Sequence, residues 1–270
     1  MTPATPSPPP VPPAPAPGAT TRRIRTGIVL PTFQQTADLA LDVAVRAEEA
    51  GVDGVFCYDH VWPLGQPDRP ALAPFPVLGL VAASTARLWL GTLVARIGLV
   101  PEAVLLSEFD ALATVAPGRV VAGVGTGDRL SAGENEAYGV PFAPARARLD
   151  ALRACVRAAV GRGVPVWVGG GSRAIRAVAA EEGAALNLWG APADVVAAES
   201  ARMEVTWAGP PPPSGGLGPM VARLADAGAT WAVLPWPVDP DELAAAGAGA
   251  GRGSGGTGPA GSTHGHAAGR

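Results

Sequence analysis

The feature that most constrains this sequence is the regular alternation of short apolar runs with helical patterns between residues 24 and 246. The runs are continuous in Val, Leu, Ile and Trp, which is typical of parallel strands covered on both faces. We expect eight strands, at residues 24–30, 54–58, 88–94, 119–124, 164–168, 185–189, 203–207 and 231–234. This pattern predicts an α/β fold with a closed (β/α)8 TIM barrel, and a doubly wound open sheet is the alternative.

The intervals between the strands carry signals for the beginnings and ends of helices. Thr36 is placed to cap a first helix that ends at Gly51. Pro101 suits the first position of another helix, and Ser172 is placed to cap a third. Residues 144–160 carry apolar side chains on one face and Arg away from it, as an amphipathic helix does.

The two ends of the chain differ in composition from its middle. Residues 1–20 are almost entirely Pro, Ala and Thr, and residues 247–270 are mostly Gly, Ala, Ser and Thr. Neither segment has side chains that would anchor it to a core, so both are predicted to be disordered tails. Residues 21–246 are predicted to form one barrel domain, somewhat lean beside the ~250 residues typical of such barrels.

Charge and cysteine content exclude several classes of protein. All 20 basic residues are Arg, which excludes Schiff-base chemistry and a phosphate-loop lysine. The net charge of -3, without a long basic cluster, argues against nucleic acid as a partner. No run approaches the ~20 apolar residues of a membrane span, and no secretory signal pattern is present. Because Cys57 and Cys155 fall in different elements, we expect reduced thiols in a cytoplasmic protein. We also expect no metal site.

The segment after the second strand contains Asp59, His60 and Trp62. Reacting groups of (β/α)8 barrels lie at the C-terminal ends of the strands and in the loops that follow. His60 is the only His outside the C-terminal tail, and a neutral imidazole there would accept a proton or bind a cofactor ring. Trp62 shares this loop and is the Trp that we expect to face a ligand. A purely structural role for His60 is the alternative.

The segment after the fourth strand reads Gly125, Thr126, Gly127 and Asp128. Its glycines allow a flat ring to approach the backbone, although the dinucleotide pattern G-x-G-x-x-G is not met. Asp128 would share the rim with His60, and a carboxyl group beside an imidazole suits acid/base chemistry. The alternative is that Asp128 pairs with the next Arg or caps a turn.

The segment after the fifth strand reads Gly169, Gly170, Gly171, Ser172 and Arg173 and leads into a helix. The free N–H groups and the positive dipole end of a helix N-terminus attract anions. Ser172 and Arg173 add a hydroxyl and a guanidinium donor. This segment is the best candidate for a phosphate site, and an ordinary glycine-rich turn with a Ser cap is the alternative.

Three further Trp residues, Trp189, Trp207 and Trp236, fall at or just beyond the ends of the last three strands. Aromatic side chains at the mouth of a barrel are suited to lining an apolar pocket for a ring system. Packing of the barrel top is the alternative for all three.

Taken together, these segments resemble the luciferase-like monooxygenase superfamily from about residue 25 to residue 235. The matching pieces are residues 27–31, the Asp59–His60 pair, and residues 90–94, 118–127 and 165–170, in this order. The resemblance implies a (β/α)8 barrel that binds FMN or the deazaflavin coenzyme F420 at its C-terminal mouth. The sequence is more similar to the deazaflavin branch of the superfamily.

The resemblance also implies roles for individual residues. His60 and Asp128 are implied as acid/base groups, with Asp standing where the family has Glu, and Trp62 is a looser match to a catalytic Trp. Asp59, Leu93, Val94 and the glycine segment 125–127 are implied beside the cofactor ring, with a non-proline cis peptide bond between Leu93 and Val94. The glycines and donors of residues 169–173 would then hold the phosphate of the cofactor.

The expected function is an oxidoreductase that transfers a hydride between F420 and an unidentified small organic substrate. The alternatives are an FMN-dependent monooxygenase fed by a separate reductase and a non-catalytic member that binds a cofactor. The family's insertion between the fourth and fifth strands is shortened here, and the absence of Lys argues against glucose 6-phosphate as the substrate. Family members are often dimers, so the resemblance is compatible with a homodimer.

Overall fold

The computed structural model describes residues 23–63, 65–213 and 216–250 of the chain. The predicted tail at residues 1–20 lies outside the described residues, as do residues 251–270. The predicted C-terminal tail begins too early, because helix α9 (Pro240–Gly249) continues past residue 246. This helix buries Leu243, Ala246 and Gly247, so the barrel domain includes its last turn.

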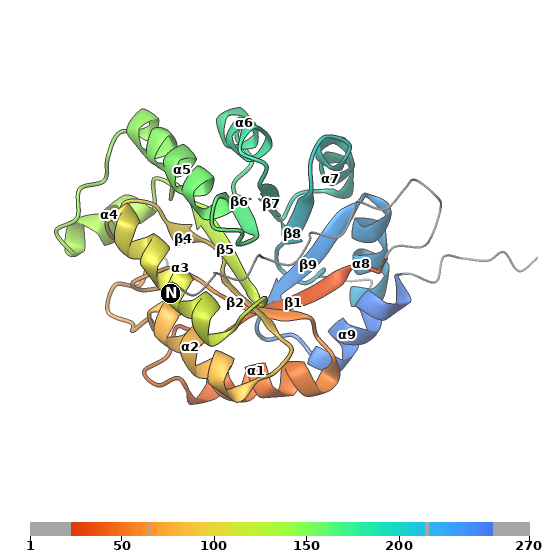
Figure 1. The fold of residues 1–270 in the computed structure, drawn as a ribbon. Helices are drawn as coiled ribbons and strands as arrows, with labels where there is room; N and C mark the ends of the chain where they lie inside the picture. The colour runs from red at the N-terminus through yellow and green to blue at the C-terminus, as the bar shows by residue number, and fades with distance from the viewer. Residues whose placement is uncertain (1–22, 64, 214–215, 251–270) are drawn as a thin grey trace, which may run out of the picture.

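Parallel strands form a closed ring in the described part of the chain (Figure 1). The strands are β1 (Arg25–Val29), β2 (Gly54–Cys57), β3 (Trp89–Thr92), β4 (Ala95–Arg96), β5 (Val120–Gly125), β6 (Val166–Gly169), β7 (Ala185–Trp189), β8 (Val205–Ala208) and β9 (Ala229–Pro235). Their order is β3-β2-β1-β9-β8-β7-β6-β5-β4, and a pairing of β3 with β5 closes the ring. Because the two-residue β4 follows directly on β3, the eight predicted strands are all present. The barrel is confirmed, and the open sheet is wrong.

Helices connect the strands and surround the ring (Figure 1). They are α1 (Asp38–Ala50), α2 (Pro74–Ser84), α3 (Glu102–Val115), α4 (Ser131–Ala137), α5 (Ala145–Val160), α6 (Arg173–Glu181), α7 (Ala193–Ser200), α8 (Leu217–Asp226) and α9. The Ser172 hydroxyl accepts a hydrogen bond from the Ile175 N–H and caps α6, as predicted. The cap predicted at Thr36 is wrong, because Ala37 precedes α1 and no side chain caps it. None of the helices within the described ranges is long and apolar enough to cross a membrane.

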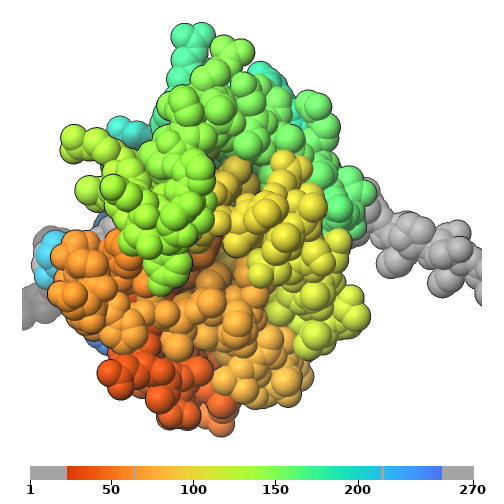
Figure 2. All heavy atoms as spheres, turned by 90° about the vertical axis from the view of Figure 1, so that its left-hand side faces the viewer, coloured from red at the N-terminus to blue at the C-terminus, as the bar shows by residue number. Residues whose placement is uncertain are grey.

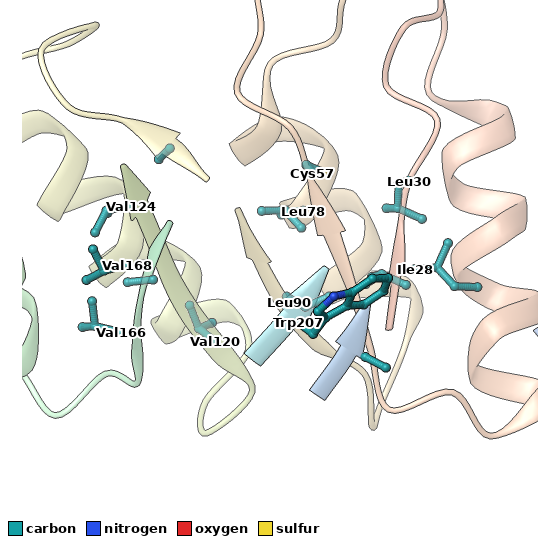
Figure 3. Packing of buried hydrophobic residues seen from close by; sticks show 14 of the residues in the cluster. Ile28, Leu30, Cys57, Leu78, Leu90, Val120, Val124, Val166, Val168 and Trp207 are labelled. Atoms are coloured by element: carbon teal, nitrogen blue, oxygen red, sulfur yellow. The ribbon is translucent and has the colours of Figure 1, made fainter. Parts of the chain in front are cut away.

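The apolar side chains form two separate cores, because successive residues of a strand point to opposite faces. The larger core lies between the strands and the helices and includes Ile28 and Leu90 (Figure 3). The smaller core fills the inside of the ring, where the Trp167 ring lies 4.9 Å from that of Phe56 and 5.3 Å from that of Trp231, centroid to centroid. The barrel is therefore packed across its middle, and room for a ligand remains at its mouth.

Glycines at the junction of β3 and β5 allow the ring to close. A Cβ atom on Gly91 would lie 2.7 Å from the carbonyl oxygen of Val121, and one on Gly123 would overlap the carbonyl oxygen of Thr92. The Thr92 hydroxyl also donates a hydrogen bond to the Gly123 carbonyl at 2.6 Å. The two strands therefore lie closer together than a Cβ atom at either glycine would permit.

We predict that Gly123→Ala destabilises the protein by about 1–3 kcal/mol or more, because backbone rather than a flexible side chain stands where the methyl group must go. Gly79→Ala is the matched control, since Gly79 lies inside α2 with no atom near the added Cβ. Alanine should stabilise that helix by about 0.5–1 kcal/mol. Urea unfolding measures both changes, and equal stability of the two variants would contradict the account of ring closure.

Candidate functional site

A cavity of about 650 Å³ opens at the C-terminal ends of the strands. All but two of the predicted site residues line it, namely Asp59, His60, Leu93, Val94, Gly125, Thr126, Gly127, Asp128, Gly169, Gly170, Gly171 and Ser172. Trp62 and Arg173 are the two that do not. The structure thus brings the segments after β2, β5 and β6 together, and the roles of their residues stay predictions.

His60 is held by a buried carboxylate that the sequence analysis did not single out. Its Nδ1 lies 2.8 Å from Oε1 of Glu134, whose side chain is 1% exposed. Because a carboxylate oxygen accepts hydrogen bonds, Nδ1 is the donor of this pair and carries the hydrogen. Nε2 is then the nitrogen left to accept a proton from a ligand.

The Glu134 carboxylate itself is matched by several donors. Its Oε2 accepts hydrogen bonds from the Val61 N–H at 3.0 Å and from Nη2 of Arg96 at 3.2 Å. The Arg96 side chain is 4% exposed and also donates to the Ser131 carbonyl at 3.3 Å. Figure 2 shows the green segment that contains α4 lying against the orange loop that follows β2. Through this contact, α4 brings Glu134 within hydrogen-bonding distance of His60. No clear sequence pattern predicts α4.

Asp59 acts on the backbone of the neighbouring strand. Its Oδ2 accepts a hydrogen bond from the Arg96 N–H at 2.8 Å, which ties the end of β2 to β4. Burial raises the pKa of the Asp59 carboxyl above its ordinary value, and the hydrogen bond and charge of Arg96 offset only part of this effect. Asp59 therefore resists ionisation more than an exposed Asp does.

Asp128 caps the turn before α4. Its Oδ1 accepts hydrogen bonds from the Leu130 N–H at 2.8 Å, the Ser131 N–H at 3.2 Å and the Ser131 hydroxyl at 3.3 Å. The capping role that was the alternative for this residue is thus present in the structure. A further role of Asp128 in proton transfer stays a prediction.

The peptide bond between Leu93 and Val94 is cis, as the resemblance implied. The Val94 side chain lies beside two of the glycines at the mouth. A Cβ atom on Gly125 would lie 2.6 Å from Cγ2 of Val94, and one on Gly169 would lie 3.0 Å from both Val94 methyl groups. Glycine at both positions therefore makes room for the Val94 isopropyl group, which lines the cavity with them.

The glycine-rich turn after β6 forms the wall of the cavity beside the N-terminus of α6. Gly170 has φ +131°, a conformation that favours glycine. Ser172 lines the cavity as well as capping the helix, whereas Arg173 is exposed and lies outside the lining. The predicted phosphate site therefore consists of backbone and one hydroxyl, without the guanidinium.

Of the four tryptophans considered as pocket residues, one lines the cavity and three lie outside its lining. Trp62 lies outside the cavity, with its ring 6.2 Å from that of Tyr138. Trp207 packs between sheet and helices (Figure 3), and its indole N–H donates to the Ala191 carbonyl at 2.8 Å. The packing alternative thus holds for Trp207. Trp236 is outside the lining and exposed, so neither interpretation fits it. Trp189 lines the cavity and is 53% exposed.

Seven lining residues were missing from the predicted site residues: Phe33, Tyr58, Arg96, Ser131, Ile175, Asn187 and Trp189. Burial raises the pKa of Tyr58 to about 12, so its hydroxyl stays protonated at neutral pH. The Asn187 amide donates to the Thr206 hydroxyl at 2.9 Å. A sequence signal for Asn187 exists, because it is the one polar side chain in the apolar run 185–189.

Comparison with known proteins agrees with this combination of barrel and glycine-lined mouth. Residues 20–162 match the family described as luciferase-like monooxygenase, which is more than half of the chain. The chain therefore belongs to this family of oxidoreductases.

Among curated proteins, the chain is 41% identical over 117 residues to an F420-dependent glucose-6-phosphate dehydrogenase of Kineococcus radiotolerans. The match covers 43% of this chain and 34% of that protein. An F420-dependent hydroxymycolic acid dehydrogenase of Mycobacterium tuberculosis is 35% identical over 106 residues, covering 39% of this chain and 29% of that protein. The chain thus matches about a third of the length of these relatives.

Solved structures show the same fold. An F420-dependent secondary alcohol dehydrogenase in complex with an F420-acetone adduct matches with a TM-score of 0.69 at 16% identity, over 83% of this chain and 98% of that one. The coenzyme F420 dependent tetrahydromethanopterin reductase of Methanopyrus kandleri matches with a TM-score of 0.62 at 13% identity, over 83% and 97%. Sequence identities this low show only that the chain shares the barrel fold with these proteins.

We predict that Asp59→Asn makes the protein more stable than the wild type, by a margin that grows as the pH rises above 3.8, the ordinary pKa of this group. A carboxyl with a raised pKa in the folded state contributes stability below its unfolded pKa, and this contribution is lost as the pH rises through the folded value. Asparagine keeps an oxygen for the Arg96 N–H. Urea unfolding of both proteins in steps from about pH 4 to about pH 8 measures the margin.

Glu48→Gln provides a control of opposite sign. Burial opposes ionisation of Glu48, but hydrogen bonds from the N–H groups of residues 86–88 outweigh it and lower the pKa. The advantage of the wild type over this variant should therefore be complete above pH 4.5 and shrink as the pH falls below it. A margin for Asp59→Asn that does not change with pH would contradict the burial of its charge.

Proposed function

We propose that this protein is an oxidoreductase that transfers a hydride between the deazaflavin coenzyme F420 and a small organic substrate. The observation that carries the proposal is a cavity in which His60, held by the buried Glu134, shares the mouth of the barrel with glycine-rich turns. Membership of the luciferase-like family supports redox chemistry, and the F420-dependent relatives favour this coenzyme over FMN.

The residues of the cavity fit a flat ring that carries a phosphate-bearing tail. Gly125, Gly169 and Val94 line the cavity together, and the two glycines make room for the Val94 side chain, against which a planar group can lie. Farther along the wall, Gly170 and Ser172 stand before the N-terminus of α6, whose free N–H groups suit a phosphate. Among the described residues, no group of three or more His, Cys, Asp or Glu is placed to hold a metal ion.

The protein's own part in the reaction is to hold the substrate and move its proton. When bound, the deazaflavin supplies the carbon that accepts or gives the hydride. Nε2 of His60 takes the proton from a substrate hydroxyl during oxidation and returns it during reduction. Glu134 fixes the ring through Nδ1, and Arg96 balances the charge of Glu134.

Titration of the purified protein with F420 and with FMN, followed by absorbance, tests the choice of cofactor. We expect F420 to bind at least about tenfold more tightly than FMN. Gly125→Ala should weaken F420 binding about tenfold, because its methyl group displaces Val94. Gly133→Ala on α4 is the control, since no atom lies near the added Cβ. Tight binding of FMN without F420 would favour an FMN-dependent monooxygenase, and binding of neither would overturn the proposal.

We predict that His60→Ala lowers turnover about 100-fold or more while changing the dissociation constant of F420 little. Glu134→Gln should also lower turnover, because an amide can turn its NH2 group toward Nδ1 and release the ring. Glu136→Gln, on the exposed side of α4, should leave turnover unchanged. Turnover is followed by cofactor absorbance with the best substrate from a panel of alcohols and ketones, and thermal melting of each variant checks folding.

Unchanged turnover in His60→Ala would remove His60 from proton transfer. A loss in Glu134→Gln that is matched by a lower melting temperature, with normal turnover per folded molecule, would assign Glu134 to stability alone.

A further inference from the structure

The cavity has two chemically different sides. One side consists of the glycine-rich turns after β5 and β6 together with Val94. The other side is aromatic and consists of Phe33, Tyr58 and Trp189. With the cofactor on the glycine-rich side, as proposed above, the aromatic side is the one left for a substrate.

The aromatic side is a continuous wall across the mouth. Tyr58 follows β2 and Trp189 ends β7, and these strands are not neighbours in the ring. Their rings nevertheless lie 6.1 Å apart at 60°, and Phe33 stacks on Tyr58 at 5.9 Å and 14°. Trp189 is 53% exposed although it faces the cavity. Folding thus leaves a large indole surface uncovered beside the site, which marks it for contact with a ligand.

The charges around the cavity do not suit an anionic substrate. Arg96 is the one cationic side chain in the described lining, apart from His60 when it is protonated. Its two terminal nitrogens already donate to Glu134 and to the Ser131 carbonyl, and the side chain is buried. Asp59 and Asp128 add carboxyl groups to the same lining. The Nε of Arg96 has no partner within the described residues, but Glu134 already balances the Arg96 charge. A phosphate or carboxylate on the substrate would therefore find no uncompensated cation among the lining residues that the structure describes.

The Tyr58 hydroxyl has no hydrogen-bond partner in the part of the chain that the structure describes, and burial of the phenol is the one cause of its raised pKa. Its ring lies 6.1 Å from that of His60 at 62°. A neutral phenol donates one hydrogen bond, and Nε2 of His60 accepts one. The two groups together therefore match the hydroxyl of an alcohol, which both accepts and donates. After oxidation the carbonyl oxygen accepts hydrogen bonds from the phenol and from the protonated Nε2.

We infer that the site takes a neutral, largely apolar alcohol or ketone that carries a flat ring, with the ring against Trp189 and Phe33 and the oxygen between Tyr58 and His60. The inference rests on the proposed function. In the oxidising direction the C–H bond of the alcohol would break, and a bound deazaflavin would supply the two-electron acceptor for its hydride. The O–H proton passes to Nε2 of His60, and the C=O bond of the ketone forms.

Equilibrium binding to the F420-loaded protein tests this inference without relying on turnover. The probes are acetophenone and 1-phenylethanol as aromatic ligands and glucose 6-phosphate as the anionic competitor, measured by calorimetry. We expect the aromatic probes to bind at least about tenfold more tightly than glucose 6-phosphate. Tyr58→Phe should weaken acetophenone binding about three- to tenfold, as loss of one neutral hydrogen bond does. Trp189→Ala should weaken it about tenfold or more.

Substitutions of a Tyr and a Trp outside the cavity serve as controls for Tyr58→Phe and Trp189→Ala. Tyr138→Phe and Trp236→Ala change an exposed Tyr and an exposed Trp outside the cavity and should leave acetophenone binding unchanged. All four variants should bind F420 as the wild type does. Glucose 6-phosphate binding as tight as that of acetophenone, or no effect of Tyr58→Phe and Trp189→Ala, would overturn the inference while F420 binding stands. Failure to bind F420 at all would instead overturn the proposed function and the inference with it.

Discussion

The close approach of β3 and β5 at their glycines closes the ring, and every part of the candidate site takes its place from this closure. Gly91 and Gly123 allow backbone to lie where a Cβ atom would collide with a carbonyl oxygen. Because the closed strands are all parallel, the segments after β2, β5, β6 and β7 end at one mouth although up to about half of the chain separates them. The aromatic core of the ring then fills its middle, so the mouth is where a ligand can enter.

A buried ionic pair lies beside the mouth, where hydrogen bonds from Val61, Arg96 and His60 satisfy the carboxylate. Glu134 and Arg96 are both nearly inaccessible and lie 3.2 Å apart. Removing one partner of such a pair typically costs about 3–5 kcal/mol, whereas an apolar replacement of the whole pair often costs nothing. The Glu134–Arg96 pair alone is therefore not expected to stabilise the fold more than apolar residues would. Its consequence for the site is that the carboxylate stays fixed under His60 and sets which ring nitrogen faces the cavity.

The sequence predicts the barrel well because the alternation of buried strands and helices is a local pattern that survives folding. It also predicts His60 and the glycine turns, since strand ends of a parallel barrel share one mouth. Glu134 could not be found in this way, because α4 is a short helix off the strand ends and its burial depends on the loop after β2. Trp62 was misplaced for a related reason: sharing a loop with His60 does not fix which way a side chain points.

The cavity side chains that have no partner in the described part of the chain indicate the ligand better than those that are already hydrogen-bonded. Asp59 and Asp128 line the cavity, yet their oxygens already accept backbone hydrogen bonds. The Trp189 surface and the Tyr58 hydroxyl lack such partners within the described residues, and Nε2 of His60 is the ring nitrogen that Glu134 leaves unused. Exposed apolar area is unfavourable in water, and a polar atom that a ligand buries must be given a hydrogen-bond partner, so a ligand that fits the cavity has to match both. Such a ligand has a flat ring that covers Trp189 and one oxygen that bonds with both Tyr58 and His60.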